Sequence, residues 1–206
     1  MTKHRSAIRR SVTVATAAIA ALVLAACGSD DSSTGPGENS SPSASAPAKK
    51  GDHNAADVAF AKGMIPHHRQ AVEMADLAET RASSSEVKSL ASEIKKAQDP
   101  EIKTLSGWLK AWGEQVPEEM GGMDHMGHDM PGMMSAEDMK ELEGLSGKAF
   151  DTAFLKMMIK HHEGAVSMAE SEKSDGSYGP AVSMAETIIT SQSGEIDRMN
   201  KLLGKG

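Results

Sequence analysis

The fold is decided by a stretch that occurs twice, first as Met64-Ile65-Pro66-His67-His68-Arg69-Gln70-Ala71-Val72-Glu73-Met74-Ala75 and again, 94 residues later, as Met158-Ile159-Lys160-His161-His162-Glu163-Gly164-Ala165-Val166-Ser167-Met168-Ala169. The register continues on both sides, pairing Asp57 with Asp151, Phe60 with Phe154, Ile94 with Ile188, Gln98 with Gln192, Glu101 with Glu195 and Ile102 with Ile196. A duplication diverges fastest where nothing constrains it. The shared Met, His, Gln and Glu residues are therefore the first candidates for function.

The apolar residues recur at helical spacing. Residues 53–80 carry a 4-3-4-3-4 stripe, which predicts an amphipathic helix: Phe60, Met64, His67, Ala71, Met74 and Ala78. A similar stripe predicts a helix over 84–113, and the second copy repeats the pattern over 154–168 and 181–203. No segment alternates with a period of two, so we expect an all-α protein.

The sequence also predicts how these helices are connected. Ser83, Ser84 and Ser85 supply turn and N-cap chemistry between the first two helices, and a turn at 174–177 separates the last two. Pro66 and Pro100 each remove a backbone donor, but the stripe stays in phase across both, so we expect kinks rather than breaks. The alternative is that Asp99-Pro100 caps a new helix.

Folding each repeat back on itself places its polar residues in one layer. A turn between residues 82 and 83 sets His67 opposite Gln98 and Met64 opposite Glu101. The second repeat likewise pairs His161 with Gln192 and Met158 with Glu195. We therefore expect residues 52–206 to form a four-helix bundle of two repeated antiparallel helix hairpins. Its parts are repeat one (53–113), a connector (118–134) and repeat two (136–204).

The start of the chain resembles an export signal. Lys3, Arg5, Arg9 and Arg10 are followed by an apolar run that ends in Leu24-Ala25-Ala26-Cys27. This ending resembles the lipobox of bacterial lipoproteins, so we expect 1–26 to be a lipoprotein signal peptide and Cys27 to be lipidated. The alternative is an ordinary secretory signal with a chance cysteine. Residues 27–51, rich in Ser, Gly, Pro and Ala, predict a flexible tether.

This organisation predicts an exported protein, lipid-anchored on the outer face of the cytoplasmic membrane and facing an extracellular or periplasmic space. Removing the four basic residues of 1–26 lowers the formal charge from −7 to −11, which argues against nucleic acid as a partner. The membrane would then be reached only through the lipid. Because Cys27 is the single cysteine, Met and His are the soft or borderline metal ligands that remain.

The duplicated stretch has the spacing of a metal site. Met64 and Met158 lie one helical turn before His67 and His161, where a di-iron bundle would have Glu-x-x-His. Thioether sulfur favours monovalent copper or silver over iron or zinc. The alternative is that buried His, Gln and Glu form a hydrogen-bonded layer that fixes helix register, with Met as core filler. We expect Asp57 and Asp151 to serve at helix starts or in salt bridges, not as ligands.

The connector is a second candidate. It holds six Met and two His in 15 residues, at positions Met120, Met123, His125, Met126, His128, Met130, Met133 and Met134. Exposed Met gains nothing and oxidises, so its density here indicates metal capture and exchange. The alternative is a hydrophobic flap that rests on the bundle.

The twin blocks Met-Ile-Pro-His-His-x-x-Ala-Val-x-Met-Ala and Met-Ile-Lys-His-His-x-x-Ala-Val-x-Met-Ala resemble the signature of domain of unknown function 305, an exported bacterial family. The resemblance covers about residues 53–204 and implies a ferritin-like bundle with a role in copper binding and tolerance. It implies these candidate ligands: Met64, His67, His68, Met74, Met158, His161, His162 and Met168. The matching Gln98, Glu101, Gln192 and Glu195 would support those ligands.

We therefore expect an exported, lipid-anchored copper-binding protein that captures, buffers or hands on copper, with the monovalent ion favoured and an unknown protein as donor or acceptor. The alternative is a metal-free structural or interaction module. An enzyme is not expected, because the chain has no nucleophile–base arrangement, no phosphate-binding glycine loop and no carboxylate-rich di-metal set.

Overall fold

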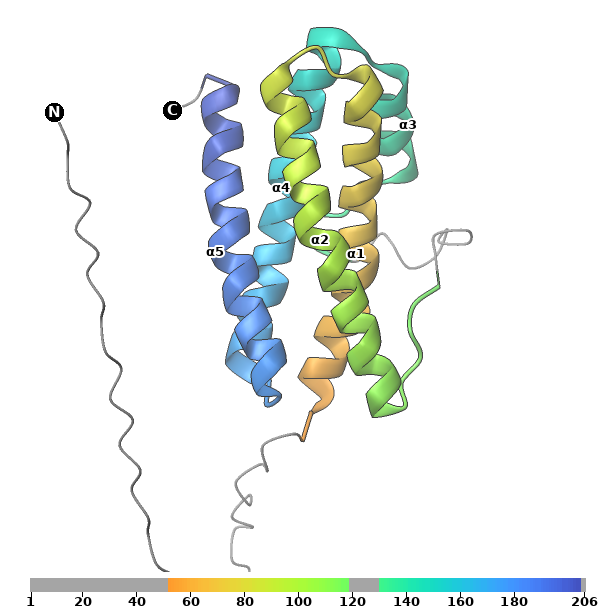
Figure 1. Ribbon diagram of the computed structural model, residues 1–206, viewed down its shortest axis with the longest axis vertical. Helices are drawn as coiled ribbons and strands as arrows, with labels where there is room; N and C mark the ends of the chain where they lie inside the picture. Colours follow the sequence, from red (N-terminus) through yellow and green to blue (C-terminus); the bar gives the residue numbers. More distant parts are fainter. Residues whose placement is uncertain (1–51, 119–129, 205–206) are drawn as a thin grey trace, which may run out of the picture. The chain divides into compact units, whose positions relative to one another are not determined.

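The computed structural model describes residues 52–118 and 130–204, and the regular structure in these ranges is helical (Figure 1). The four long helices are α1 (Ala55–Arg81), α2 (Ser85–Trp112), α4 (Gly147–Asp175) and α5 (Gly179–Leu202). Apart from one isolated bridge, no β-structure occurs in the described residues. The all-α bundle expected from the sequence is confirmed.

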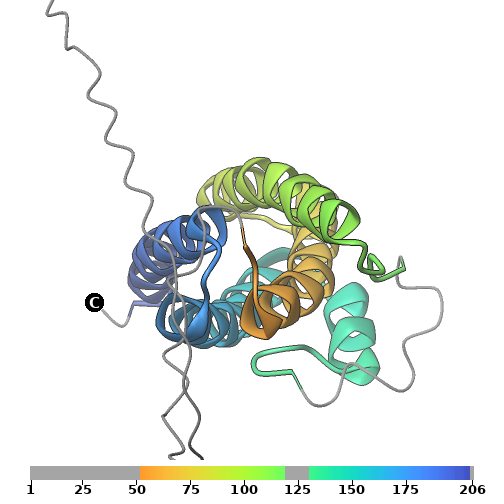
Figure 2. The same cartoon turned by 90° about the horizontal axis from the view of Figure 1, so that it is seen from below.

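A fifth, short helix, α3 (Ala136–Gly144), was not separated from the second repeat by the sequence analysis. It lies beside the ring of four helices rather than within it (Figure 2) and contacts α1 and α4. A capping box starts it: the Ser135 hydroxyl accepts from the Asp138 backbone N–H, and the Asp138 carboxylate accepts from the Ser135 N–H. This Ser-x-x-Asp signal was present in the sequence.

Both internal prolines lie inside continuous helices. α1 runs through Pro66 and α2 through Pro100, so the alternative in which Asp99-Pro100 begins a new helix is wrong. The side chain of Ser84 caps α2 as expected, accepting from the Val87 backbone N–H at 3.3 Å.

The four long helices form two hairpins, α1–α2 and α4–α5, which meet mainly through α1 and α4. Two aspartates, 94 residues apart, join the hairpins reciprocally. Asp151 of α4 accepts from the backbone N–H groups of Ser83 and Ser84 at 3.0 Å each, in the α1–α2 turn. Asp57 of α1 accepts from the backbone N–H groups of Ser177 and Tyr178 in the α4–α5 turn, the latter at 2.9 Å. Each repeat therefore caps the turn of the other.

The buried apolar residues form two clusters, one toward each end of the bundle. The first is built around Phe150, Phe154, Leu90 and Ile94, and the second around Phe60, Leu105, Leu109 and Ile188. Between them, at the middle of each long helix, lie buried polar residues: His67, His68, Gln98, His161, His162 and Gln192. The two hairpins thus bring the duplicated polar residues together across the centre of an apolar bundle.

Candidate metal centre

Two histidines meet where the hairpins touch. His67 of α1 and His161 of α4 are fully buried, and their ring centroids lie 3.8 Å apart. They are counterparts in the duplication, so the contact joins one repeat to the other at equivalent positions. Burial of two imidazoles against each other in an apolar bundle is costly unless their ring nitrogens find partners.

The next residue of each repeat binds a carboxylate within its own hairpin. His68 Nε2 lies 2.7 Å from Glu101 Oε2, and His162 Nε2 lies 2.6 Å from Glu195 Oε2. Counting residues from the turns predicts Glu101 and Glu195 opposite Met64 and Met158. The structure instead pairs each glutamate with a histidine one turn further along the helix, within the same polar layer.

These contacts leave a set of ring nitrogens without partners. Among the described side chains, the Nδ1 atoms of all four histidines and Nε2 of His161 are buried and make no hydrogen bond. The carboxylates beside His68 and His162 fit imidazoles that carry the proton on Nε2, so each Nδ1 offers a lone pair. A metal-binding histidine typically donates its other ring N–H to a carboxylate or a backbone carbonyl. The layer has this arrangement.

The electrostatics keep the central pair neutral. Burial, reinforced by the neighbouring His68, lowers the pKa of His67 to about 3. Burial and the adjacent His67 also lower the pKa of His161 well below its ordinary value. Both imidazoles are therefore uncharged at neutral pH, which is the form that binds a metal ion.

The thioethers divide into a central and a peripheral set. Met64 and Met158, one turn before the central histidines, are fully buried at the inner edges of the two apolar clusters. Met74 is fully buried deeper in the first cluster, whereas its counterpart Met168 is partly exposed. The structure thus does not give these duplicated methionines equivalent surroundings. Within residues 52–118 and 130–204 no three His, Cys, Asp or Glu side chains gather as a metal site.

Much of the connector lies outside the described residues, including Met120, Met123, His125, Met126 and His128. Its last part, residues 130–134, packs against the bundle and is called the strap below. Met133 and Met134 are buried, as a hydrophobic flap would require. Gln70 fixes the strap with two amide hydrogen bonds to the backbone of Met134, at 2.7 and 2.9 Å.

The strap also reaches the central histidines. The backbone carbonyl oxygen of Pro131 lies 3.1 Å from His67 Nε2 and accepts a hydrogen bond from it. This contact assigns the proton of His67 to Nε2 and leaves its Nδ1 free, as in His68 and His162. Neither Pro131 nor Gln70 was predicted from the sequence as a site residue. The available signal was that position 70 differs between the repeats, with Gly164 as its counterpart.

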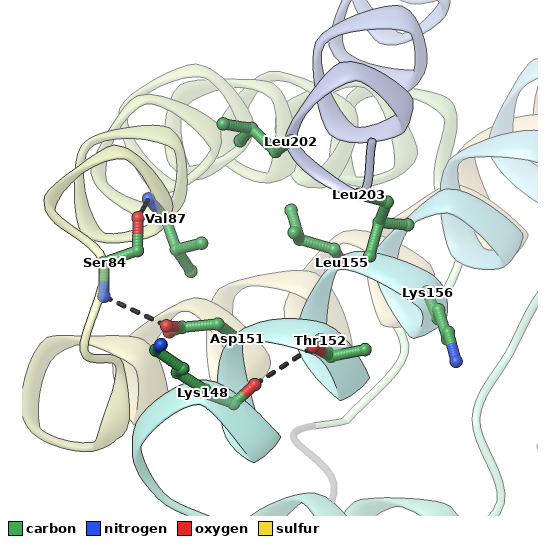
Figure 3. Close-up of a pocket in the computed structure, with 9 residues that line it drawn as sticks. All are labelled: Ser84, Val87, Lys148, Asp151, Thr152, Leu155, Lys156, Leu202 and Leu203. Atoms are coloured by element: carbon green, nitrogen blue, oxygen red, sulfur yellow. Dashed lines mark hydrogen bonds between the residues drawn. The ribbon is translucent and has the colours of Figure 1, made fainter. Parts of the chain in front are cut away.

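A separate pocket of about 460 Å³ lies at one end of the bundle (Figure 3), and none of the candidate ligands lines it. Its lining includes Ser84 and Leu202, whose counterparts in the duplication are Tyr178 and Trp108. At the other end of the bundle those two aromatic rings pack edge to face, with centroids 5.4 Å apart. The pocket therefore corresponds to a place that two aromatic side chains occupy at the other end of the bundle.

Comparison with known proteins identifies relatives of this architecture. Residues 57–203 match the profile of a domain of unknown function, DUF305, whereas no curated protein is significantly similar to the chain. A crystal structure described as a secreted DUF305 protein from Streptomyces coelicolor is 35% identical, with a TM-score of 0.66, covering 73% of this chain and 93% of the other. A DUF305 fragment from Deinococcus radiodurans is 29% identical, with a TM-score of 0.65 and coverage of 74% and 98%.

The protein CopM, solved with Cu(II) bound, is 35% identical, with a TM-score of 0.62, covering 71% of this chain and 94% of CopM. CopM has also been solved with Cu(I) bound and with silver bound. The family expected from the twin His-His blocks is confirmed by the match, which covers both repeats. The chain belongs to the DUF305 family.

Proposed function

We propose that the protein binds copper outside the cytoplasm and that the central layer of the bundle holds the ion. The observation that carries this proposal is the set of buried, unpartnered Nδ1 atoms on His67, His68, His161 and His162. Unpaired buried polar atoms are rare in native proteins, and here they occur at duplicated positions in one layer of the bundle. Such atoms are what a metal ion would satisfy.

The chemistry of the layer favours a monovalent ion. The layer supplies neutral imidazoles and, from Met64 and Met158, thioether sulfur, which is the donor set of a soft ion such as Cu(I) or Ag(I). Glu101 and Glu195 would then orient the ligands from behind, since each is bonded to the far nitrogen of a histidine. The relative CopM has been solved with Cu(II), with Cu(I) and with silver bound, which supports copper binding without favouring one oxidation state.

Export and anchoring are part of the proposal. The signal sequence and Cys27 lie outside the described residues, and none of the described helices is long and apolar enough to cross a membrane. We infer that a lipid on Cys27 holds the bundle at the outer face of the cytoplasmic membrane. From there it would buffer copper or pass it to a partner protein.

The competing function is a metal-free module in which the histidines only fix helix register. Anaerobic titration of the full chain with Cu(I) separates the two. The expected result is that H67Q/H161Q loses one tightly bound equivalent, whereas H53Q, a change at an exposed histidine, keeps it.

A second pair of variants tests the thioethers. M64L/M158L should weaken binding, whereas M199L, at a fully buried methionine outside the layer, should not. If the wild type and H67Q/H161Q bind the same number of ions with the same affinity, the central layer holds no copper. The metal-free structural module is then the better account of the layer. To separate the connector from the bundle, each titration is repeated with serine at the five Met and His positions of 119–129.

A further inference from the structure

We propose that Met130 and Met168 form a second, solvent-accessible site for a soft monovalent cation, which the strap holds beside the central histidines. The ion would pass from this site to His67 and His161, and this role as an entry point rests on the proposed function. The site itself is argued from the packing of the strap alone.

The two methionines converge on one glycine. A Cβ atom placed on Gly63 would lie 2.9 Å from Met168 Cε and 3.8 Å from Met130 Sδ. Gly63 thus leaves the space into which both side chains reach, from α4 and from the strap. Its counterpart in the second repeat is Met157, whose side chain takes up the room that glycine leaves open in the first repeat. Only the first repeat has this gap.

The pair is accessible and adjacent to the centre. Met130 and Met168 are partly exposed, in contrast to the fully buried Met64, Met74 and Met158. Pro131, the residue after Met130, accepts the hydrogen bond from His67. A cation held by the two thioethers would therefore be bound by the residue next to Pro131, whose carbonyl group contacts the imidazole of His67.

Close backbone packing fixes the position of Met130. A Cβ atom on Gly164 would overlap the carbonyl oxygen of Pro131 and lie 2.7 Å from the Cα of Gly132, so only glycine lets the strap approach α4. Gly132 has a φ of 81°, in the left-handed region that favours glycine. On the other side, the amide bonds of Gln70 hold Met134. These contacts fix the position of the strap, and therefore also the position of Met130.

The test uses Ag(I), which is redox-stable, added to the full chain with serine at the Met and His positions of 119–129. Methionine methyl groups are followed by NMR. The methyl signals of Met130 and Met168 are expected to shift together, in a saturable manner, and M130L/M168L is expected to weaken this binding about tenfold or more. M184L, at another partly buried methionine, is the matched control and should leave binding unchanged.

A second comparison tests the strap. G164A should displace it and weaken binding at Met130 and Met168, whereas G194A, where a Cβ would meet nothing within 4 Å, should not. Hydrogen exchange of the Met134 amide reports strap displacement independently of any metal, and it should accelerate in G164A alone.

The proposal is overturned if Ag(I) leaves the two methyl signals unmoved, if M130L/M168L binds as M184L does, or if G164A binds as G194A does despite a released Met134 amide. H67Q/H161Q separates this inference from the proposed function. The Met130–Met168 signals should still respond in that variant, even if the central layer proves to hold no metal.

Discussion

Mild acid should destabilise this protein through its central histidines. The pKa of His67 is lowered to about 3 in the folded state, against 6.5 for the free side chain. Between these two pH values His67 is therefore protonated in the unfolded chain but not in the folded chain. Stability from such a group is present above pH 6.5 and is lost as the pH falls through the folded pKa. Between pH 7 and pH 5, His67 alone should remove about 2 kcal/mol from the free energy of unfolding. His161 is shifted in the same direction and adds to the loss.

Urea denaturation in metal-free buffer at pH 7 and pH 5 measures this loss. H67Q/H161Q should show a pH-dependent loss smaller than that of the wild type by at least about 2 kcal/mol, because glutamine does not titrate. H53Q, at an exposed histidine, should behave as the wild type does. Equal losses in the wild type and H67Q/H161Q would refute the reasoning, since the acid sensitivity would then come from other groups.

Two further predictions concern the bonds between the hairpins. Asp151→Ala leaves the backbone N–H groups of Ser83 and Ser84 without their acceptor and should lower the free energy of unfolding by about 3 kcal/mol, measured by urea denaturation at pH 7. Burial, together with the neighbouring Asp57, raises the pKa of Glu172 to about 8, so this carboxyl costs stability as the pH rises from 4.5 to 8. The Glu172→Gln variant should therefore become increasingly more stable than the wild type as the pH rises from 4.5 to 9. A stability difference that stays constant across that range would contradict the assignment.

The duplication explains why so much of the fold was predictable. The period of the apolar stripe predicts the helices, and the constant offset of 94 residues predicts two helix hairpins with equivalent residues. Measuring equal distances from the turn placed His67 and His161 in one layer with Gln98 and Gln192, all of which are buried. Local periodicity was sufficient because each hairpin pairs residues close to its own turn.

Contacts between the hairpins were not predictable by the same means. Asp57 and Asp151 were expected at helix starts or in salt bridges, and Asp57 does belong to the capping box that begins α1. Their bonds to the turns of the opposite hairpins, however, join residues 67 to 121 positions apart. The histidine partners of Glu101 and Glu195 were not predicted, for a related reason. Counting residues from the turn gives the layer, but the rotation of each helix decides which side chain meets the carboxylate.

The differences between the repeats are as informative as their likeness. Where one repeat has Gly63 and Gln70, the other has Met157 and Gly164. Both differences lie at the strap: Gly63 and Gly164 make room for it, and Gln70 binds it. An exact two-fold repeat would present the central histidines equally to both sides. Among the described residues, the strap contacts the central pair through Pro131, which binds His67 and not His161. If the centre holds copper, the asymmetry that the strap introduces would give the ion a preferred way in, and loss of Gly164 should remove that preference while leaving the duplicated ligands in place.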